Sequence, residues 1–176
     1  MDELLYQLII EAKRGNEEAF SSLVTRYKRQ VFRHAFAMVN DRMEAEDISQ
    51  EAFVKAYFSI SKLNNEYGFV SWLTRIVSNL CYDRIKKKEK TVPFGNGEKD
   101  LLLSTYSSHN QSQMRMTLQE AMQELSVEYR TVLVLREVEG YSYNEMAEIL
   151  HIPLGTVKSR LSAARELLKK ELVRGD

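Results

Sequence analysis

The sequence contains few of the residues that crosslink a chain or interrupt its helices. Among 176 residues there are one cysteine, two prolines and seven glycines. The lone cysteine, Cys81, excludes an internal disulfide and favours a reducing, intracellular setting. No apolar run approaches the roughly 18 residues of a membrane span. The acidic start Met1–Glu3 also lacks the basic segment of a secretory signal, so we expect a cytoplasmic protein that does not insert into a membrane.

The chain has no excess of charge of either sign. Its 25 basic and 25 acidic residues give a formal net charge of +0, which by itself gives no indication of nucleic-acid binding. The charges are unevenly distributed, however, with acidic residues at 41–51 and basic residues at 84–90 and 158–174. Such separation along a chain predicts separate surfaces for separate partners.

The spacing of the apolar residues predicts an all-α fold. Few segments alternate apolar and polar residues as a half-buried strand does, and most place apolar residues three and four positions apart. In the first half of the chain this spacing predicts four helices, with Cys81 buried as a small apolar residue in the last one. The third helix is expected at 43–59. In the other three helices the expected inward-facing residues are Leu4, Leu5, Leu8, Ile9 and Ala12, then Phe20, Leu23, Val24, Tyr27, Val31, Ala35 and Met38, and then Phe69, Leu73, Ile76 and Leu80.

The periodicity fades between residues 91 and 113, where turn-forming and polar residues dominate. This composition predicts a flexible linker that joins two small helical domains, residues 1–90 and 114–176. Each domain is small, so each core is expected to be modest.

The segment 141–172 has the pattern of a helix-turn-helix. Ser142 and Glu145 have the spacing of a capping box at the start of a helix 143–150. A break at 151–155, with Pro153 at its exit, precedes a second helix expected to begin near Thr156. The second helix has one apolar face, formed by Val157, Leu161, Ala164 and Leu168, and a neighbouring basic stripe suited to DNA phosphates and base edges.

The run from Leu125 to Leu150, followed by Ile152 to Glu166, resembles the promoter-binding C-terminal domain of extracytoplasmic-function (ECF) sigma factors of bacterial RNA polymerase. The resemblance implies that this domain recognises the upstream −35 element. Two residues depart from the usual pattern, His151 for glycine and Ser126 for proline, and both substitutes are compatible with a left-handed turn and a helix N-cap. The expected −35 contacts are Thr156, Lys158, Ser159, Ser162, Arg165 and Lys169.

Asp47, Gln50 and Glu51 lie three and four residues apart and share one face of the third helix. As a charge cluster alone, this face is more typical of a solvated surface. The segment 44–53, however, resembles the one with which sigma factors bind the clamp helices of the RNA polymerase β′ subunit. Carboxylates also occur in catalytic sites, but no histidine or metal-ligand spacing accompanies these. We therefore expect no enzymatic activity, no cofactor and no metal site.

The fourth helix has a polar, basic and aromatic face opposite its apolar stripe, as single-stranded DNA binding requires. The segment 69–80 resembles the one that reads the downstream −10 element in ECF sigma factors. In that family the preceding loop captures an unstacked base, which here implicates Asn64, Asn65 and Tyr67 by position. On the helix itself the expected contacts are Ser71, Arg75, Asn79, Tyr82 and Lys86, with Ser78 on the same face.

The resemblance spans nearly the whole chain and implies an alternative sigma factor that directs promoter-specific initiation. The implied partners are core RNA polymerase, through the β′ clamp helices and the β subunit, and promoter DNA. An anti-sigma protein, in some cases anchored in the membrane, is implied as well. Two alternatives remain open at this point. One is a dimeric helix-turn-helix regulator that does not bind polymerase, and the other is a helical adaptor that binds only proteins.

Overall fold

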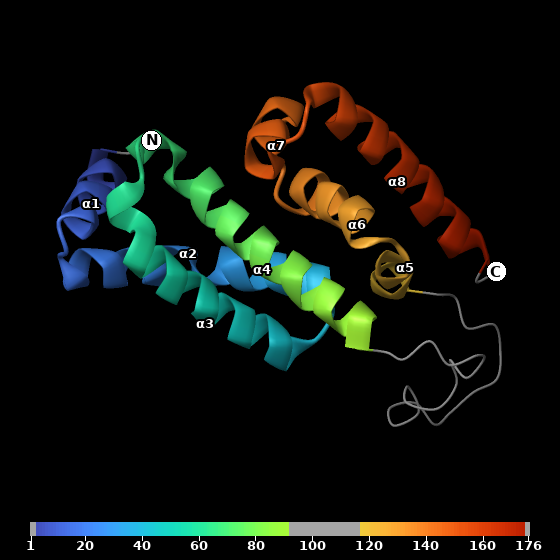
Figure 1. Ribbon diagram of the computed structural model, residues 1–176, viewed down its shortest axis with the longest axis horizontal. Coiled ribbons are helices and arrows are strands. Elements are labelled where there is room, and N and C mark those ends of the chain that lie inside the picture. Colours follow the sequence, from blue (N-terminus) through green and yellow to red (C-terminus); the bar gives the residue numbers. More distant parts are fainter. Residues whose placement is uncertain (1–2, 92–116, 175–176) are drawn as a thin grey trace.

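The computed structural model of the chain describes residues 3–91 and 117–174, and every regular element in these two ranges is a helix (Figure 1). The all-α prediction is therefore confirmed. Apart from Thr91, the expected linker 91–113 lies outside the described residues.

The first range forms four α-helices: α1 (Glu3–Lys13), α2 (Glu17–Val39), α3 (Arg42–Ser59) and α4 (Phe69–Thr91). Two short 3-10 helices, η1 (Ile60–Lys62) and η2 (Glu66–Gly68), connect α3 to α4. Side chains at the helix starts explain these boundaries. Asn16 accepts a hydrogen bond from the Ala19 N–H at 3.0 Å, and Asp41 accepts one from the Glu44 N–H at 2.9 Å. Caps of this kind bond N–H groups that the first helical turn leaves without partners.

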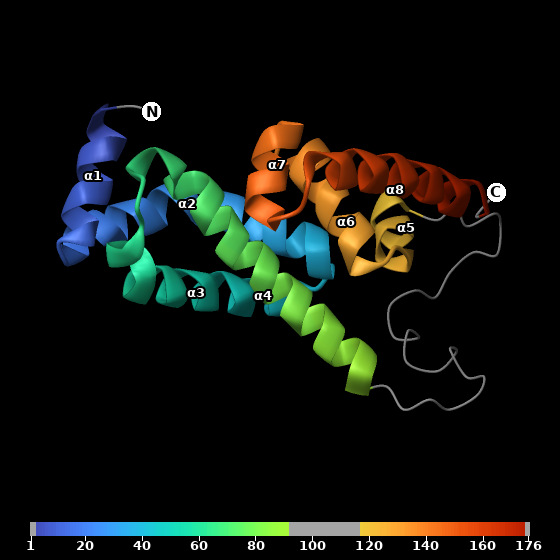
Figure 2. The same ribbon diagram turned by 45° about the horizontal axis from the view of Figure 1, so that its top comes forward.

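The helices α2, α3 and α4 pack around one core, and α1 covers one end of α2 (Figures 1 and 2). The expected inward stripes are largely buried, as is Cys81. Leu4 is an exception. It was expected in the apolar stripe of α1 but is 62% exposed, because the buried face of this short helix is formed by Leu5, Ile9 and Ala12.

The second range comprises α5 (Leu118–Glu124), α6 (Val127–Leu133), a π-helical turn η3 (Val134–Val138), α7 (Tyr143–Leu150) and α8 (Leu154–Arg174). The predicted capping box is present: Glu145 N–H donates to Ser142 Oγ at 3.3 Å, and Ser142 N–H donates to Glu145 Oε2 at 2.8 Å. His151 ends α7 in the left-handed conformation (φ 52°), as its expected tolerance of this turn implies.

Two local expectations for this domain differ from the structure. The helix α8 begins at Leu154, two residues before Thr156, because the Pro153 carbonyl already accepts a helical bond from Val157 N–H at 3.1 Å. Gly155 therefore lies in the first turn, where its N–H needs no helical partner. Ser126 does occupy the N-cap of α6, but its side chain makes no capping hydrogen bond.

The two groups of helices pack against each other. The C-terminal helices α5, α6 and α7 lie beside α2 and α4 (Figures 1 and 2), and buried apolar residues from both groups belong to one continuous core. The surfaces that carry the predicted functional residues must therefore be considered with this packing in place.

Candidate nucleic-acid interface

The acidic face of α3 is only partly open. Asp47 and Gln50 are exposed, and none of the described residues pairs with either side chain. Glu51 instead turns toward α4, where its Oε2 lies 3.2 Å from Arg84 Nη2 and its Oε1 lies 3.4 Å from Lys55 Nζ. Of the three residues predicted for a partner, Asp47 and Gln50 are free to bind one without first breaking an ion pair.

The acidic cluster 41–51 and the basic cluster 84–90 face each other across the α3–α4 packing. Arg84 pairs with Glu51, and Lys88 pairs with Glu44. The expectation that these two clusters form separate surfaces is therefore wrong, because antiparallel packing places the start of α3 beside the end of α4. Only the basic stripe of α8 is separate from the acidic helix.

The loop between η1 and α4 projects three of its predicted residues into solvent. Asn64, Asn65 and Tyr67 are exposed between the buried Leu63 and Phe69. Asn65 Oδ1 accepts a hydrogen bond from the Tyr67 N–H at 3.0 Å and so caps η2. No described residue bonds the Asn64 side chain, so Asn64 has both its donor and its acceptor available for a base.

The predicted DNA face of α4 divides into two parts. Ser71 and Arg75 are half-buried and Asn79 is exposed. Nearer the end of the helix, Tyr82 and Lys86 both contact Glu128 of α6: the Tyr82 hydroxyl donates to Glu128 Oε1 at 3.2 Å, and Lys86 Nζ lies 3.6 Å from the same oxygen.

The C-terminal helices cover one side of this face. A hollow of about 220 Å³ lies between α4 and these helices, lined by Ser78, Asn79 and Tyr82 on one side and by Glu128, Thr131, Leu150 and Arg160 on the other. Ser78 itself is 4% exposed, and its Oγ lies 3.0 Å from His34 Nε2, so its placement on the open DNA face is wrong. Helical spacing had put it on that face, but the neighbouring α2 covers it.

All but one of the predicted contacts on α8 are exposed, Thr156 being half-buried. Lys158, Ser162 and Lys169 form an open stripe, and the Ser159 hydroxyl donates to the Thr156 carbonyl at 3.1 Å. Arg165 is already paired, with its Nε and Nη2 at 3.1 Å and 2.6 Å from Glu137 Oε1. This pair is itself exposed, so water and salt weaken it.

Arg130 forms a contact between the domains that the sequence did not indicate. Its guanidinium, on a residue 5% exposed, donates to five oxygens, four of which belong to α5 and the residue after it. The fifth is the Met38 carbonyl at the end of α2, 2.6 Å from Nη1. One buried arginine therefore bonds the C-terminal ends of two helices from different domains, where the helix dipoles favour a cation.

Further polar contacts join α2 and α4 to the C-terminal domain. Thr74 Oγ1 lies 2.8 Å from the Tyr141 hydroxyl, and Gln30 Nε2 donates to Glu139 Oε2 at 3.0 Å. His34 is buried in the same region, where burial, with the charge of Arg33, lowers its pKa to about 4. The ring is therefore neutral at physiological pH and can bond Ser78.

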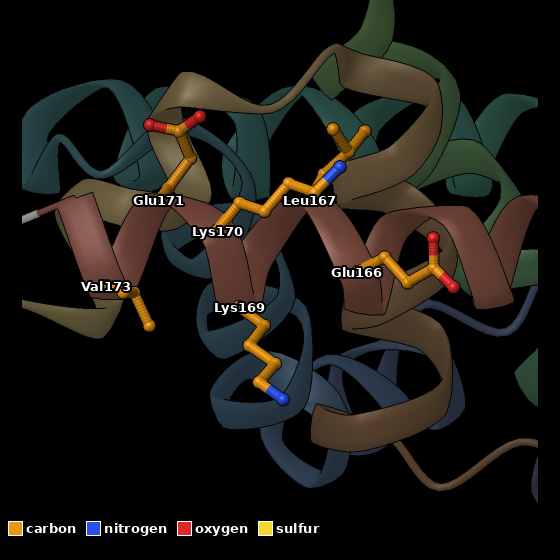
Figure 3. A pocket seen from close by; sticks show the side chains of 6 residues that line it. All are labelled: Glu166, Leu167, Lys169, Lys170, Glu171 and Val173. Carbon is orange, nitrogen blue, oxygen red and sulfur yellow. The ribbon is translucent and has the colours of Figure 1, made fainter.

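Two further hollows lie on the C-terminal helices, and one of about 410 Å³ is lined by Arg136, Ser142, Tyr143, Asn144, Leu154 and Lys158. The other, of about 700 Å³, follows the end of α8, but its lining side chains, including Glu166, Lys169 and Glu171, point away from the helix in different directions (Figure 3). Within residues 3–91 and 117–174, no three His, Cys, Asp or Glu side chains are placed to hold a metal ion. In the same ranges no helix is both long and apolar enough to cross a membrane. Burial raises the pKa of Cys81 to about 12, so its thiol stays protonated.

Comparisons with known proteins assign the two parts of the chain. Residues 23–91 match the family model Sigma-70 region 2, and residues 115–168 match Sigma-70, region 4. The ECF RNA polymerase sigma factor SigW of Bacillus subtilis is 34% identical, with 98% of each chain covered. The chain belongs to the ECF sigma factors.

Other relatives agree with this membership. The RNA polymerase sigma-H factor of Pseudomonas aeruginosa is 33% identical over 94% of this chain and 92% of its own. The fold is shared with CnrH, solved in complex with the cytosolic domain of CnrY, at a TM-score of 0.72 and 22% identity, with 99% of this chain and 100% of that chain covered. It is also shared with RpoE of Bartonella quintana, solved with the anti-sigma factor NepR, at a TM-score of 0.66 and 23% identity, with 87% and 96% covered.

As an ECF sigma factor, the chain is an alternative sigma factor that binds core RNA polymerase and directs transcription from promoter DNA. Membership of this family makes it an initiation factor and not an enzyme. The two alternatives, a dimeric regulator without polymerase binding and a protein-binding adaptor, are not favoured.

Proposed function

We propose that residues 1–90 bind core polymerase and the −10 element, that residues 114–176 bind the −35 element, and that residues 91–113 link the two. The observation that carries this proposal is the separation of three exposed surfaces on different elements: Asp47 and Gln50 on α3, Asn64 and Tyr67 before α4, and the basic stripe of α8. A sigma factor must contact polymerase and two DNA elements at once, and these surfaces do not overlap.

On the polymerase side, Asp47 and Gln50 make the direct contacts with the β′ clamp helices. Both are exposed and unpaired within the described residues, and they present a carboxylate and an amide at adjacent positions of one helix face. Glu51 contacts polymerase only after its ion pair with Arg84 of α4 is replaced by a contact with a polymerase residue. The β subunit is the expected second contact of polymerase with this chain.

On the DNA side, Lys158, Ser162 and Lys169 of α8 meet the −35 duplex, with Thr156 and Ser159 at the start of the helix and Arg165 after release from Glu137. The −10 element meets Asn64, Asn65 and Tyr67 first, then Ser71, Arg75 and Asn79 along α4. Tyr82 and Lys86 join them only when Glu128 withdraws. The lysines and arginines among these residues contribute to DNA affinity through phosphate contacts and the release of counterions.

The test is initiation by purified core polymerase with this protein on a promoter selected by the same holoenzyme from a randomised duplex pool. The double substitution Asp47→Ala with Gln50→Ala should weaken binding to core polymerase by about tenfold, as loss of one carboxylate contact and one amide contact predicts. Its matched control removes an exposed acid and amide from α1, Glu11→Ala with Gln7→Ala. Equal binding by the two variants would remove the proposed role of α3.

The same holoenzyme tests the −35 surface. Lys158→Ala should weaken binding to the selected −35 duplex and lower the dependence of that binding on salt by about one counterion, while binding to core polymerase is unchanged. Lys28→Ala on α2 is the control for loss of an exposed lysine. A salt dependence identical to that of the control would contradict the assignment of α8.

An anti-sigma protein is the third proposed partner. Two structures that share this fold, those of CnrH with CnrY and of RpoE with NepR, hold the sigma chain in a complex with another protein. In this chain the exposed Val54 and Phe58 continue the α3 surface beyond Asp47 and Gln50, so a protein bound there would also block polymerase. Co-expression with the product of the adjacent gene tests this, because an anti-sigma protein should abolish binding to core polymerase. The proposed site of action is the cytoplasm, with a membrane-anchored form of that partner as one way of holding the factor inactive.

A further inference from the structure

The loop that precedes α4 is anchored at both ends by buried side chains. Leu63 is 8% exposed and Phe69 is 1% exposed, whereas Asn64, Asn65 and Tyr67 between them lie in solvent. Exposed loops of this kind ordinarily sample several conformations, and any ordering that occurs only on binding reduces affinity. Contacts that order the loop in the free protein therefore affect what it can recognise.

Lys13 provides one such contact from the last turn of α1. Its ammonium donates to the Leu63 carbonyl at 2.6 Å and to Glu66 Oε1 at 2.5 Å. The two side chains of this ion pair are each 21% exposed, so water competes less than it does on an open surface. The bond from Lys13 also lowers the pKa of Glu66, which keeps its carboxylate charged. Lys13 of α1 therefore bonds both the Leu63 carbonyl and the Glu66 carboxylate of the loop.

Tyr6 provides a second contact from the same face of α1, two helical turns before Lys13. Its ring centroid lies 5.4 Å from that of Tyr67, with the planes tilted by 36°. This separation lies within the favourable range for aromatic pairs. Tyr67 is nevertheless 67% exposed, so one edge and face of its ring remain available to another ring.

We propose that α1 is a positioning element for −10 recognition, in which Lys13 and Tyr6 hold the loop 63–68 in the conformation that receives an unstacked base. The inference rests on the proposed role of this loop in base capture. Lys13 and Tyr6 act through Glu66 and Tyr67 and do not contact DNA. Their effect is on the choice of base, because a loop held in one shape discriminates between bases better than one that adjusts to each.

The experiment uses full-length protein with core polymerase and the promoter that the wild-type holoenzyme selects from randomised duplexes. A 2-aminopurine placed at each −10 position in turn reports unstacking by its rise in fluorescence. The variants are Lys13→Met and Lys13→Arg, Tyr6→Ala and Tyr6→Phe, and the control Lys28→Met, which removes an exposed lysine of α2. Glu66→Met provides a second way to break the ion pair if Lys13→Met does not fold.

The Lys13→Met variant should lose on the order of tenfold in discrimination between the preferred and a substituted base at the unstacked position, as loss of a charge-assisted contact predicts. Its −35 binding should remain unchanged. Lys13→Arg should recover most of the discrimination, because arginine can donate to both oxygens. Tyr6→Ala should show a similar loss, and Tyr6→Phe should behave as wild type because the ring contact is kept.

Three results would overturn the inference, and they are distinguishable. If Asn64→Ala and Tyr67→Ala lower the fluorescence rise but Lys13→Met matches the Lys28→Met control, the loop role stands and the positioning role is wrong. If Lys13→Met weakens initiation equally on preferred and substituted promoters, its role is structural only. If Asn64→Ala and Tyr67→Ala change nothing, the loop does not capture a base, and both the proposed loop role and the inference fail.

Discussion

The two helices proposed to contact DNA, α4 and α8, differ in what lies beside them. On α4 two of the proposed contacts, Tyr82 and Lys86, contact Glu128 of the other domain, and Lys86 also bonds Glu89 of its own helix. On α8 the basic stripe is open, and the pair of Arg165 with Glu137 is exposed and lies within its own domain. The free chain therefore presents its proposed −35 surface open to solvent and part of its proposed −10 surface covered.

The position of each helix in the fold explains this difference. The helix α4 packs on α2 and α3 on one side and on α6 and α7 on the other, so little of its circumference is free. The helix α8 packs within its own domain, and its opposite side faces solvent. If α4 contacts the −10 element as proposed, its covered part must first be released, and single substitutions can remove the contacts that cover it.

The largest expected effect comes from the residue that joins the two domains most firmly. Arg130→Met should lower the free energy of unfolding by about 3 kcal/mol, because it leaves buried carbonyl oxygens without donors. Urea unfolding measures this, and a second, separate transition would show that the domains no longer unfold together. The control is Arg136→Met, which removes one hydrogen bond to the Tyr141 carbonyl and a contact with the Tyr143 ring, and should cost less. Equal losses would mean that the Met38 contact does not hold the covered face.

The stability of the region around His34, beside the contacts between the domains, should also depend on pH. The folded-state pKa of His34 is about 4, against 6.5 for an ordinary histidine, so below pH 6.5 the unfolded chain binds a proton that the folded chain does not. Stability from this group is complete above pH 6.5 and falls as the pH drops toward 4. Between pH 7 and 5 the wild-type protein should lose about 2 kcal/mol more than His34→Gln, which keeps an acceptor for Ser78. Parallel losses in urea unfolding at the two pH values would contradict the burial of His34.

Release of Glu128 should uncover α4 without unfolding the protein. Glu128→Lys places two cations together at Lys86 and should raise the affinity of the free protein for a labelled single-stranded oligonucleotide by about fivefold, as loss of a weak inter-domain contact predicts. Glu18→Lys, in the first turn of α2, makes the same change in net charge at a distant exposed site. The control matters because any added positive charge favours DNA. A gain no larger than that of Glu18→Lys would show that Glu128 does not cover the −10 surface.

The smallest effect is expected on the open helix. Glu137→Gln removes the ion pair of Arg165 and should raise affinity for the −35 duplex by only about twofold, because an exposed ion pair contributes little. Glu166→Gln, on the exposed side of α8, is the control with the same charge change. An increase as large as that of Glu128→Lys would remove the contrast between the two helices.

Much of the fold was predictable from the spacing of residues along the chain. The boundaries of α7, its capping box and the left-handed His151 follow from local rules, because each depends on residues within one or two turns. The start of α8 was misplaced by two residues, because Gly155 was expected to interrupt a helix although its position in the first turn makes it tolerable. Helical spacing also placed Ser78 on an open face, where periodicity cannot distinguish solvent from a neighbouring helix.

The candidate site was predicted as a set of residues but not as a set of contacts. The exposed positions of Asp47, Gln50 and Lys158 follow from charge and helical spacing, whereas the choice of Asp47 and Gln50 as polymerase contacts came from the family resemblance. The partners of Glu51, Tyr82 and Lys86 could not be predicted from the sequence, because Arg84 and Glu128 are 33 to 46 residues away from the residues they bond. Arg130 left no signal at all, because a buried arginine looks in sequence like any basic residue at the polar edge of a helix.

The sequence by itself determined that the chain is helical, that its end carries a helix-turn-helix with a basic stripe, and that an acidic helix lies near its start. These properties depend on short-range spacing, which a one-dimensional pattern records fully. The tertiary structure decided which of the charged residues remain free, that the basic end of α4 pairs with Glu44 and Glu51 of the acidic helix, and that α1 contacts the loop before α4. Those outcomes depend on which distant surfaces pack together. The net charge of +0 gives no information about them, because an ion pair adds zero to the net charge wherever it forms.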